Sequence, residues 1–246
     1  MKVLFTCAGG KFVKNLIRYL KVDKNLSHYD FYGTDQKKIS KGPFKKIFKL
    51  NIKKNYINNI KKICILNNIN LIIPYSDSEA LILSKYKKLF GKKKIMILTN
   101  NFNTNKRISN KFYVYNLLKK KKIKVPKFYF IKKLSEFNNK LKLLNFPNKT
   151  VVLKPIDQIG GRGVVFLKGK DFQKIKRIKV GKREKVLEIN KLNFTQYLKK
   201  YKKILIMEKL NPPAHDVDYF RQNKKKLISI RRRINPSGIP YKGNTI

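Results

Sequence analysis

Cysteine is scarce in this sequence and long apolar runs are absent, and each absence excludes a class of protein. The two cysteines, Cys7 and Cys64, form no CxxC pair. This argues against a disulfide framework and a cysteine zinc site, so we expect two small apolar groups in a reducing compartment. Lysine interrupts every apolar run well short of the roughly 20 residues of a membrane span, and residues 3–8 are too short for a signal peptide. We therefore predict a soluble, cytoplasmic protein with no membrane partner.

Acidic residues are also scarce: 13 Asp and Glu stand against 61 Lys and Arg, giving a formal net charge of +48. One interpretation is a polyanionic partner, either nucleic acid or an anionic membrane. The other is composition, because the lysines are spread along the whole chain and accompany abundant Asn and Ile, which AT-rich codons encode. A dedicated nucleic-acid binder more often clusters its charge and uses arginine for base contacts. We favour composition and do not expect nucleic acid as a specific partner.

Apolar residues make up 42% of the chain, which predicts a globular protein, and their pattern predicts an α/β fold. The first hundred residues alternate short apolar runs with amphipathic stretches, which is typical of a parallel, doubly wound sheet. We expect strands at 2–8, 30–33, 47–50, 70–74 and 95–98 and helices at 12–20, 56–67 and 76–86. Ser76 and Glu79 fit a capping box, which explains Asp77 and Glu79 more simply than a carboxylate pair.

The pattern changes in the Asn-rich stretch at 100–105, where we place a domain boundary. The first domain then covers residues 1–105 and the second covers residues 106–246. In the second we expect helices at 110–121 and 134–144 and strands at 127–131, 150–154, 163–167, 204–210, 216–221 and 227–233.

The most informative segment is a β-rich run that ends at Lys154 and leads into a loop with Gly160, Gly161 and Gly163. Glycine permits positive φ and close approach of the backbone, so successive N–H groups can point at phosphate oxygens. Lys154 would add a point charge. An ordinary β-hairpin turn would explain the glycines equally well. The chain has no GxxxxGK motif followed by Ser or Thr, and Gly9-Gly10 is not GxGxxG, so neither a P-loop nor a dinucleotide site is expected.

The order of several short motifs resembles that of ATP-grasp enzymes, most of all carbamoyl-phosphate synthase large subunits and their stand-alone carboxylate–amine ligase relatives. The matching segments are Val3 to Gly10, Gly33-Thr34-Asp35, Ile72-Ile73-Pro74 with Asp77 and Glu79, Asn110-Lys111 with Val125-Pro126, Lys154-Pro155 with Gly160 to Val164, and Met207 to Leu210. The similarity covers essentially the whole chain. It implies a Rossmann-like pre-ATP-grasp domain followed by an ATP-grasp α+β unit that is incomplete at its C-terminal end.

The resemblance also implies roles for particular residues. The residues that it assigns to ATP are Lys111, Lys154, Gly160, Gly161, Gly163, Glu208, Leu210 and Arg233. The two lysines would contact phosphates, the glycines would form a mobile flap over them, and Glu208 with Leu210 would lie at the adenine and ribose. Glu208 interrupts an apolar strand, where a carboxylate needs a partner such as the adenine amino group or a surface lysine. Arg233 could face the phosphates or could be a solvated strand edge.

Two departures from the family pattern concern acidic residues. Ala214 or His215 stands where the family has an acidic ribose ligand, so no ribose ligand is assigned. ATP-grasp chemistry also needs Mg²⁺ held by carboxylates, yet no Asp or Glu follows Asp218. We therefore expect no metal ligand in this chain. A fragment, half of a split protein and a degenerate relative all remain open.

The resemblance implies an ATP-dependent ligase that activates a carboxylate as an acyl-phosphate, which an amine or ammonia then attacks. ATP and Mg²⁺ are the expected cofactors, and a partner chain could supply the missing C-terminal part. No residue is assigned a catalytic role. The alternatives are a non-catalytic ATP-binding scaffold and a basic nucleic-acid-binding protein.

Overall fold

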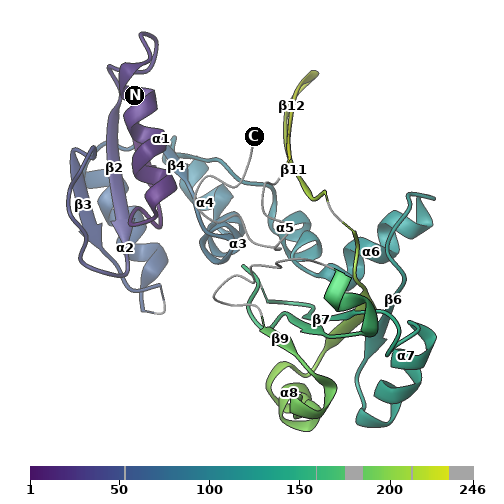
Figure 1. The fold of residues 1–246 in the computed structure, drawn as a ribbon. Coiled ribbons are helices and arrows are strands. Elements are labelled where there is room, and N and C mark those ends of the chain that lie inside the picture. The colour runs from purple at the N-terminus through teal and green to yellow at the C-terminus, as the bar shows by residue number, and fades with distance from the viewer. Residues whose placement is uncertain (53, 159, 175–184, 212, 233–246) are drawn as a thin grey trace. The chain divides into compact units, whose positions relative to one another are not determined.

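A computed structural model describes residues 1–52, 54–158, 160–174, 185–211 and 213–232 (Figure 1). The chain separates into two compact units, Met1–Ser109 and Asn110–Ile246. The predicted boundary near residue 105 falls inside helix α5 (Phe102–Ile108), which belongs to the first unit. No helix in the described part of the chain is both long enough and apolar enough to cross a membrane.

The first unit is a parallel five-stranded sheet with helices on both faces. Its strands, in the spatial order β3-β2-β1-β4-β5, are β3 (Lys46–Lys49), β2 (Asp30–Asp35), β1 (Lys2–Phe5), β4 (Leu71–Ile73) and β5 (Met96–Ile97). Its helices are α1 (Lys11–Val22), α2 (Tyr56–Leu66), α3 (Asp77–Lys85), α4 (Lys87–Gly91) and α5. All of the predicted strands and helices are present, which confirms the α/β prediction. The sequence did not predict α4 and α5, because α4 is too short to show helical periodicity and α5 is mostly polar.

Burial explains why the strands of this unit are almost continuously apolar. Val13 of α1 packs with Phe5 on one face of the sheet, while Ile60 of α2 packs with Leu4 on the other. A parallel sheet whose two faces are both covered needs apolar residues at successive positions rather than at alternate ones.

A buried carboxylate lies at the carboxyl ends of β1 and β4. Glu79 is only 6% exposed, and it accepts hydrogen bonds from Thr6 Oγ1 at 2.9 Å, Tyr56 OH at 2.9 Å and Ser76 Oγ at 2.7 Å. Ser76 does cap α3, accepting from the Glu79 N–H at 3.3 Å. The capping-box prediction is wrong for the Glu79 side chain, however. Its carboxylate links the end of β1 to α2 and the start of α3, because the buried Thr6 and Tyr56 hydroxyls and the half-buried Ser76 hydroxyl need an acceptor there.

The second unit contains a mixed five-stranded sheet. Its strands, in the order β6-β10-β7-β8-β9, are β6 (Phe128–Ile131), β10 (Ile204–Glu208), β7 (Val151–Pro155), β8 (Val165–Leu167) and β9 (Lys185–Leu187). All neighbouring pairs are antiparallel except β8 and β9. Its helices are α6 (Lys111–Lys120), α7 (Phe137–Leu143) and α8 (Phe194–Tyr201), with 3₁₀ turns η1 (Leu134–Glu136), η2 (Lys170–Lys174) and η3 (Ile189–Lys191).

Two apolar clusters cover the two faces of this sheet. On one face α7 and α8 pack together, and the rings of Phe137 and Phe194 stack with centroids 3.7 Å apart. On the other face the smaller cluster of Val152, Val164 and Met207 lies against Tyr115 of α6. The two faces are therefore chemically different, and the second is the less thickly covered.

Strands β11 (His215–Gln222) and β12 (Lys225–Arg232) pair only with each other in the described residues (Figure 1). Val217 and Ile230 lie opposite each other and are 60% and 66% exposed. Asp218 and Arg231 form an ion pair across the hairpin. The apolar side chains of this hairpin are therefore exposed to water. An isolated two-stranded hairpin is only marginally stable.

Candidate functional site

Lys154 lies on the less thickly covered face of the second sheet. Successive side chains of a strand point to opposite faces, so Lys154 shares the face of Val152 in β7. Val152 belongs to the cluster with Val164 and Met207, and Lys154 itself is half-buried. The sheet thus presents one cation beside an apolar surface, an arrangement that suits a ligand with an anionic and an apolar part.

Lys111 is held beside the loop that follows Lys154. As the first residue of α6, it donates its backbone N–H to the carbonyl of Ile156 at 3.2 Å. Its ammonium donates to the carbonyl of Pro155 at 3.2 Å and to the carbonyl of Gln158. The structure therefore places the Lys111 ammonium against the backbone that directly follows Lys154, 43 positions later in the sequence.

The three glycines of the loop all have positive φ: +60° at Gly160, +71° at Gly161 and +74° at Gly163. Only glycine adopts such angles without strain in three positions so close together. The Gly161 carbonyl accepts from the Val164 N–H at 3.2 Å, which closes the turn into β8. These angles satisfy the conformational requirement of a phosphate loop, and the φ values alone are equally compatible with a β-turn.

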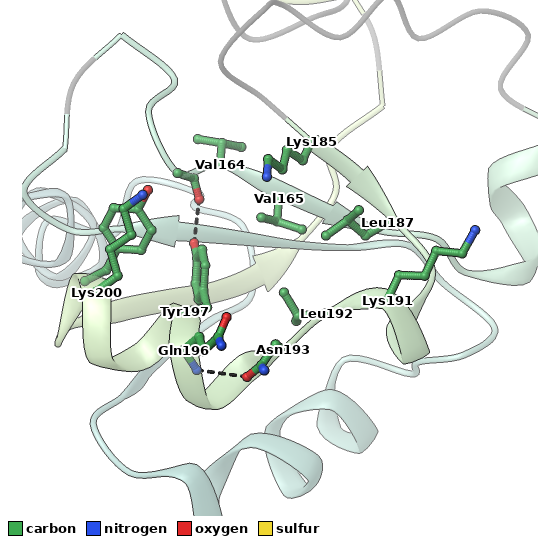
Figure 2. Close-up of a pocket in the computed structure, with 12 residues that line it drawn as sticks. Val164, Val165, Lys185, Leu187, Lys191, Leu192, Asn193, Gln196, Tyr197 and Lys200 are labelled. Atoms are coloured by element: carbon green, nitrogen blue, oxygen red, sulfur yellow. Dashed lines mark hydrogen bonds between the residues drawn. The ribbon is translucent and has the colours of Figure 1, made fainter.

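Helix α8 holds the end of this loop. The Tyr197 hydroxyl donates to the Gly163 carbonyl at 2.5 Å (Figure 2). Burial, followed by the nearby Tyr201, raises the pKa of Tyr197, so the hydroxyl remains a donor. A cavity of about 320 Å³ lies beside this contact, among Lys185, Lys200 and other residues of β8, β9 and α8 (Figure 2). The cavity lies largely on the face that α8 covers, opposite Lys154, and it shares Val164 with the apolar cluster beside Lys154.

Replacing Tyr197 with phenylalanine should lower the free energy of unfolding by about 1 kcal/mol, because the Gly163 carbonyl loses its hydroxyl donor. For a chain of this size that corresponds to a fall in Tm of roughly 2–4 °C, measurable by circular dichroism. Tyr219→Phe is the control, since the Tyr219 side chain is 56% exposed on the hairpin. Equal Tm values for the two variants would contradict a structural role for the contact.

Glu208 has a different partner from the two considered from the sequence. Its Oε1 accepts from the backbone N–H of Lys127 at 2.7 Å, and its own N–H donates to the Lys127 carbonyl at 3.0 Å. The carboxylate is thus fixed at the junction of β10 and the start of β6, where it extends the strand pairing. The donor is thus a backbone N–H rather than a lysine ammonium, and the second carboxylate oxygen could still contact a ligand.

The two remaining predicted ATP-binding residues are Leu210 and Arg233. Leu210 follows β10 and is 59% exposed. Arg233 lies outside the described residues. The sequence interpretation missed Lys209, whose pKa burial lowers. Lys209 directly follows Glu208, the last residue of β10, and this position next to a predicted site residue was the signal that could have identified it.

The described residues do not form a metal site: no group of three or more His, Cys, Asp or Glu among them could hold a metal ion. Mg²⁺ binds chiefly carboxylate and phosphate oxygens, so the donor set of this part of the chain does not fit it.

Solved structures with this arrangement of elements come from several enzymes. The biotin carboxylase domain of Hydrogenobacter thermophilus 2-oxoglutarate carboxylase matches with a TM-score of 0.62 at 13% identity, covering 94% of this chain and 49% of that one. Staphylococcus aureus N5-carboxyaminoimidazole synthetase matches with a TM-score of 0.61 at 11% identity (94% and 54% covered). Bacillus licheniformis L-amino acid ligase matches with a TM-score of 0.61 at 11% identity (99% and 52% covered). The chain shares the fold of the matching parts of these three enzymes.

Similarity of fold is not matched by similarity of sequence. No protein-family model matches this chain, and no curated protein matches it. The chain spans about half the length of the three solved structures. The first was crystallised with MgADP, ADP and bicarbonate, and the second with ADP.

Proposed function

We propose that this chain binds ATP on the second unit and contributes the nucleotide-binding half of an ATP-dependent carboxylate–amine ligase. The observation that supports the proposal is the convergence of Lys111 and Lys154 on the loop of Gly160, Gly161 and Gly163. Two ammonium groups beside a turn of glycines suit a triphosphate, which needs charge and closely approaching N–H groups. The nucleotide-bound crystal structures of the same fold support it further.

In the proposed complex, the apolar cluster beside Lys154 supplies the surface for adenine. Val152, Met207 and Phe128 lie there. Glu208 and Leu210, at the end of β10, would lie at the adenine and ribose, with Lys209 near them. Apolar side chains would then contact the adenine end of the nucleotide, and the ammonium groups of Lys111 and Lys154 would contact its phosphate end. This arrangement would orient the γ-phosphate toward the glycine loop.

In the proposed reaction a carboxylate oxygen attacks the γ-phosphorus of ATP, ADP leaves and an acyl-phosphate forms. An amine or ammonia then attacks the acyl carbon and displaces inorganic phosphate. Lys111 and Lys154 would stabilise the charge that develops on the transferred phosphoryl group. The carboxylate pocket and the metal ligands would come from outside the described residues, either from a partner chain or from further sequence. In this proposal the first unit is the Rossmann-like domain that precedes an ATP-grasp unit. The proposed ligase would be of the carbamoyl-phosphate-synthase-like subtype.

The direct test is ATP binding measured by calorimetry, with and without Mg²⁺ and at two salt concentrations. Lys154→Ala should weaken binding by roughly 1.5–3 kcal/mol, the value of a charged hydrogen bond, or about ten- to 150-fold. Lys142→Ala, which removes an exposed lysine from α7, is the control and should bind ATP as the wild type does. Equal, salt-sensitive binding by all three proteins would mean that the overall charge attracts phosphate, and the site would be rejected.

A non-catalytic ATP-binding scaffold is the second candidate, favoured by the lack of a carboxylate cluster among the described residues. It predicts ATP binding without turnover. Mg²⁺-dependent release of ADP in the presence of a carboxylate and an amine would contradict it.

A further inference from the structure

A second hollow of the second unit combines aromatic rings with lysines. It has a volume of about 730 Å³ and lies between the end of α6, the connection after it and β6. This volume is within the range of about 300–1,000 Å³ typical of ligand sites. We call it the α6–β6 groove. Of the residues placed in the proposed ATP site, only Phe128 also lines it.

Aromatic residues are concentrated in the groove. Four of its twelve lining residues are aromatic, against 12% of the whole chain. They are Phe112, Phe128, Tyr129 and Phe130, and all four are half-buried. Phe112 stacks on Phe130 with centroids 4.7 Å apart and meets Phe128 edge-on at 6.2 Å. The rings of Phe112, Phe128 and Phe130 brace one another and still reach the surface, so these three form a rigid platform on which a planar group can stack.

Cations surround these rings. Lys119, Lys122, Lys124 and Lys127 line the groove and are exposed, and no Asp or Glu is among its lining residues. None of the four takes part in an ion pair within the described part of the chain. The composition of the chain accounts for lysine here as elsewhere, but it does not account for the aromatic platform among the lysines.

We propose that the α6–β6 groove binds single-stranded nucleic acid without sequence preference. A base would stack on the platform of Phe112 and Phe130, and flanking phosphates would lie beside Lys119 and Lys124. Stacking on aromatic rings together with a basic track is how proteins bind single strands, because every base has a π face. A duplex keeps its bases stacked internally and cannot use the platform. An acidic peptide would use the lysines and leave the rings unused.

The test is fluorescence anisotropy with a labelled oligothymidine of roughly 10 nucleotides, near the middle of known site sizes. Two charge-matched variants separate the groove from the general charge. Lys119→Glu with Lys124→Glu changes two lysines of the groove, whereas Lys120→Glu with Lys121→Glu changes two exposed neighbours that do not line it. We expect the first pair to weaken binding roughly tenfold or more and the second pair less than about threefold. Equal losses would overturn the proposal.

Phe112→Leu tests the platform while keeping an apolar side chain, and it should weaken binding at least roughly fivefold. Circular dichroism would confirm that this variant folds. An unchanged affinity, or equal binding of a duplex of the same length, would overturn stacking. Saturating ATP should leave the oligonucleotide bound, and displacement by ATP would place the rings in the nucleotide site instead. Because the test uses no ATP hydrolysis and changes neither Lys111 nor Lys154, its outcome does not depend on the proposed ligase function.

Discussion

Replacing Glu79 with alanine is expected to lower the free energy of unfolding by about 3–5 kcal/mol. The carboxylate accepts from Thr6, Tyr56 and Ser76, and it is only 6% exposed. Its removal leaves buried hydroxyls without their acceptor, and each such loss costs about 1–3 kcal/mol. Urea unfolding followed by circular dichroism of the full chain measures the effect.

Asp77→Ala is the matched control, because Asp77 lies in the same first turn of α3 and is exposed. It removes only a favourable charge near the helix N-terminus, worth about 0.3–1 kcal/mol. Glu79→Gln should fall between the two, since an amide oxygen can accept some of the same hydrogen bonds. If Glu79→Ala lowered the free energy of unfolding no more than Asp77→Ala does, the Glu79 carboxylate would contribute no more than an exposed charge at the helix N-terminus.

Replacing Gly163 with alanine should be the most damaging single change in the glycine loop. Gly163 has φ of +74°, and an added Cβ would lie 2.6 Å from the Tyr201 ring and 2.8 Å from Pro155. Left-handed φ costs a non-glycine residue about 1–2 kcal/mol, and forced overpacking adds about 1–3 kcal/mol. We expect a loss of roughly 2–5 kcal/mol in stability, measured as a lower Tm.

Gly91→Ala is the control for a glycine substitution without crowding, because an added Cβ at Gly91 meets nothing within 4 Å. Gly91 ends α4, so alanine there should be neutral or slightly stabilising. A Gly163→Ala protein with the Tm of the wild type would show that the loop relaxes away from Tyr201. It would then hold no fixed conformation for a ligand.

The sequence predicted the strands and helices with the strongest periodicity. The predicted strand at 30–33 corresponds to β2 and the predicted helix at 56–67 to α2, because apolar spacing reports local structure directly. The sequence did not predict the short or mostly polar elements. Helix α8, with its N-cap Asn193, had no expected counterpart, although it covers one face of the second sheet and donates the Tyr197 hydroxyl to Gly163.

For the candidate site, the sequence identified residue types but not their partners. The glycines after Lys154 indicated positive φ, and the structure has it at all three positions. Nothing local indicated that the Lys111 ammonium would reach the carbonyls of Pro155 and Gln158, or that the Glu208 carboxylate would take the Lys127 N–H. These contacts join segments more than 40 positions apart in the chain.

The sequence by itself determined the α/β class, the positions of the main strands and the glycine loop, because periodicity, burial and φ preference are properties of neighbouring residues. Tertiary structure alone decided what those residues contact. Glu79 is an example: its spacing from Ser76 indicated a helix cap, yet its carboxylate is buried where β1, α2 and α3 meet. Hydrogen-bond demand in a buried place depends on which distant segments fold together, and no local pattern contains that information.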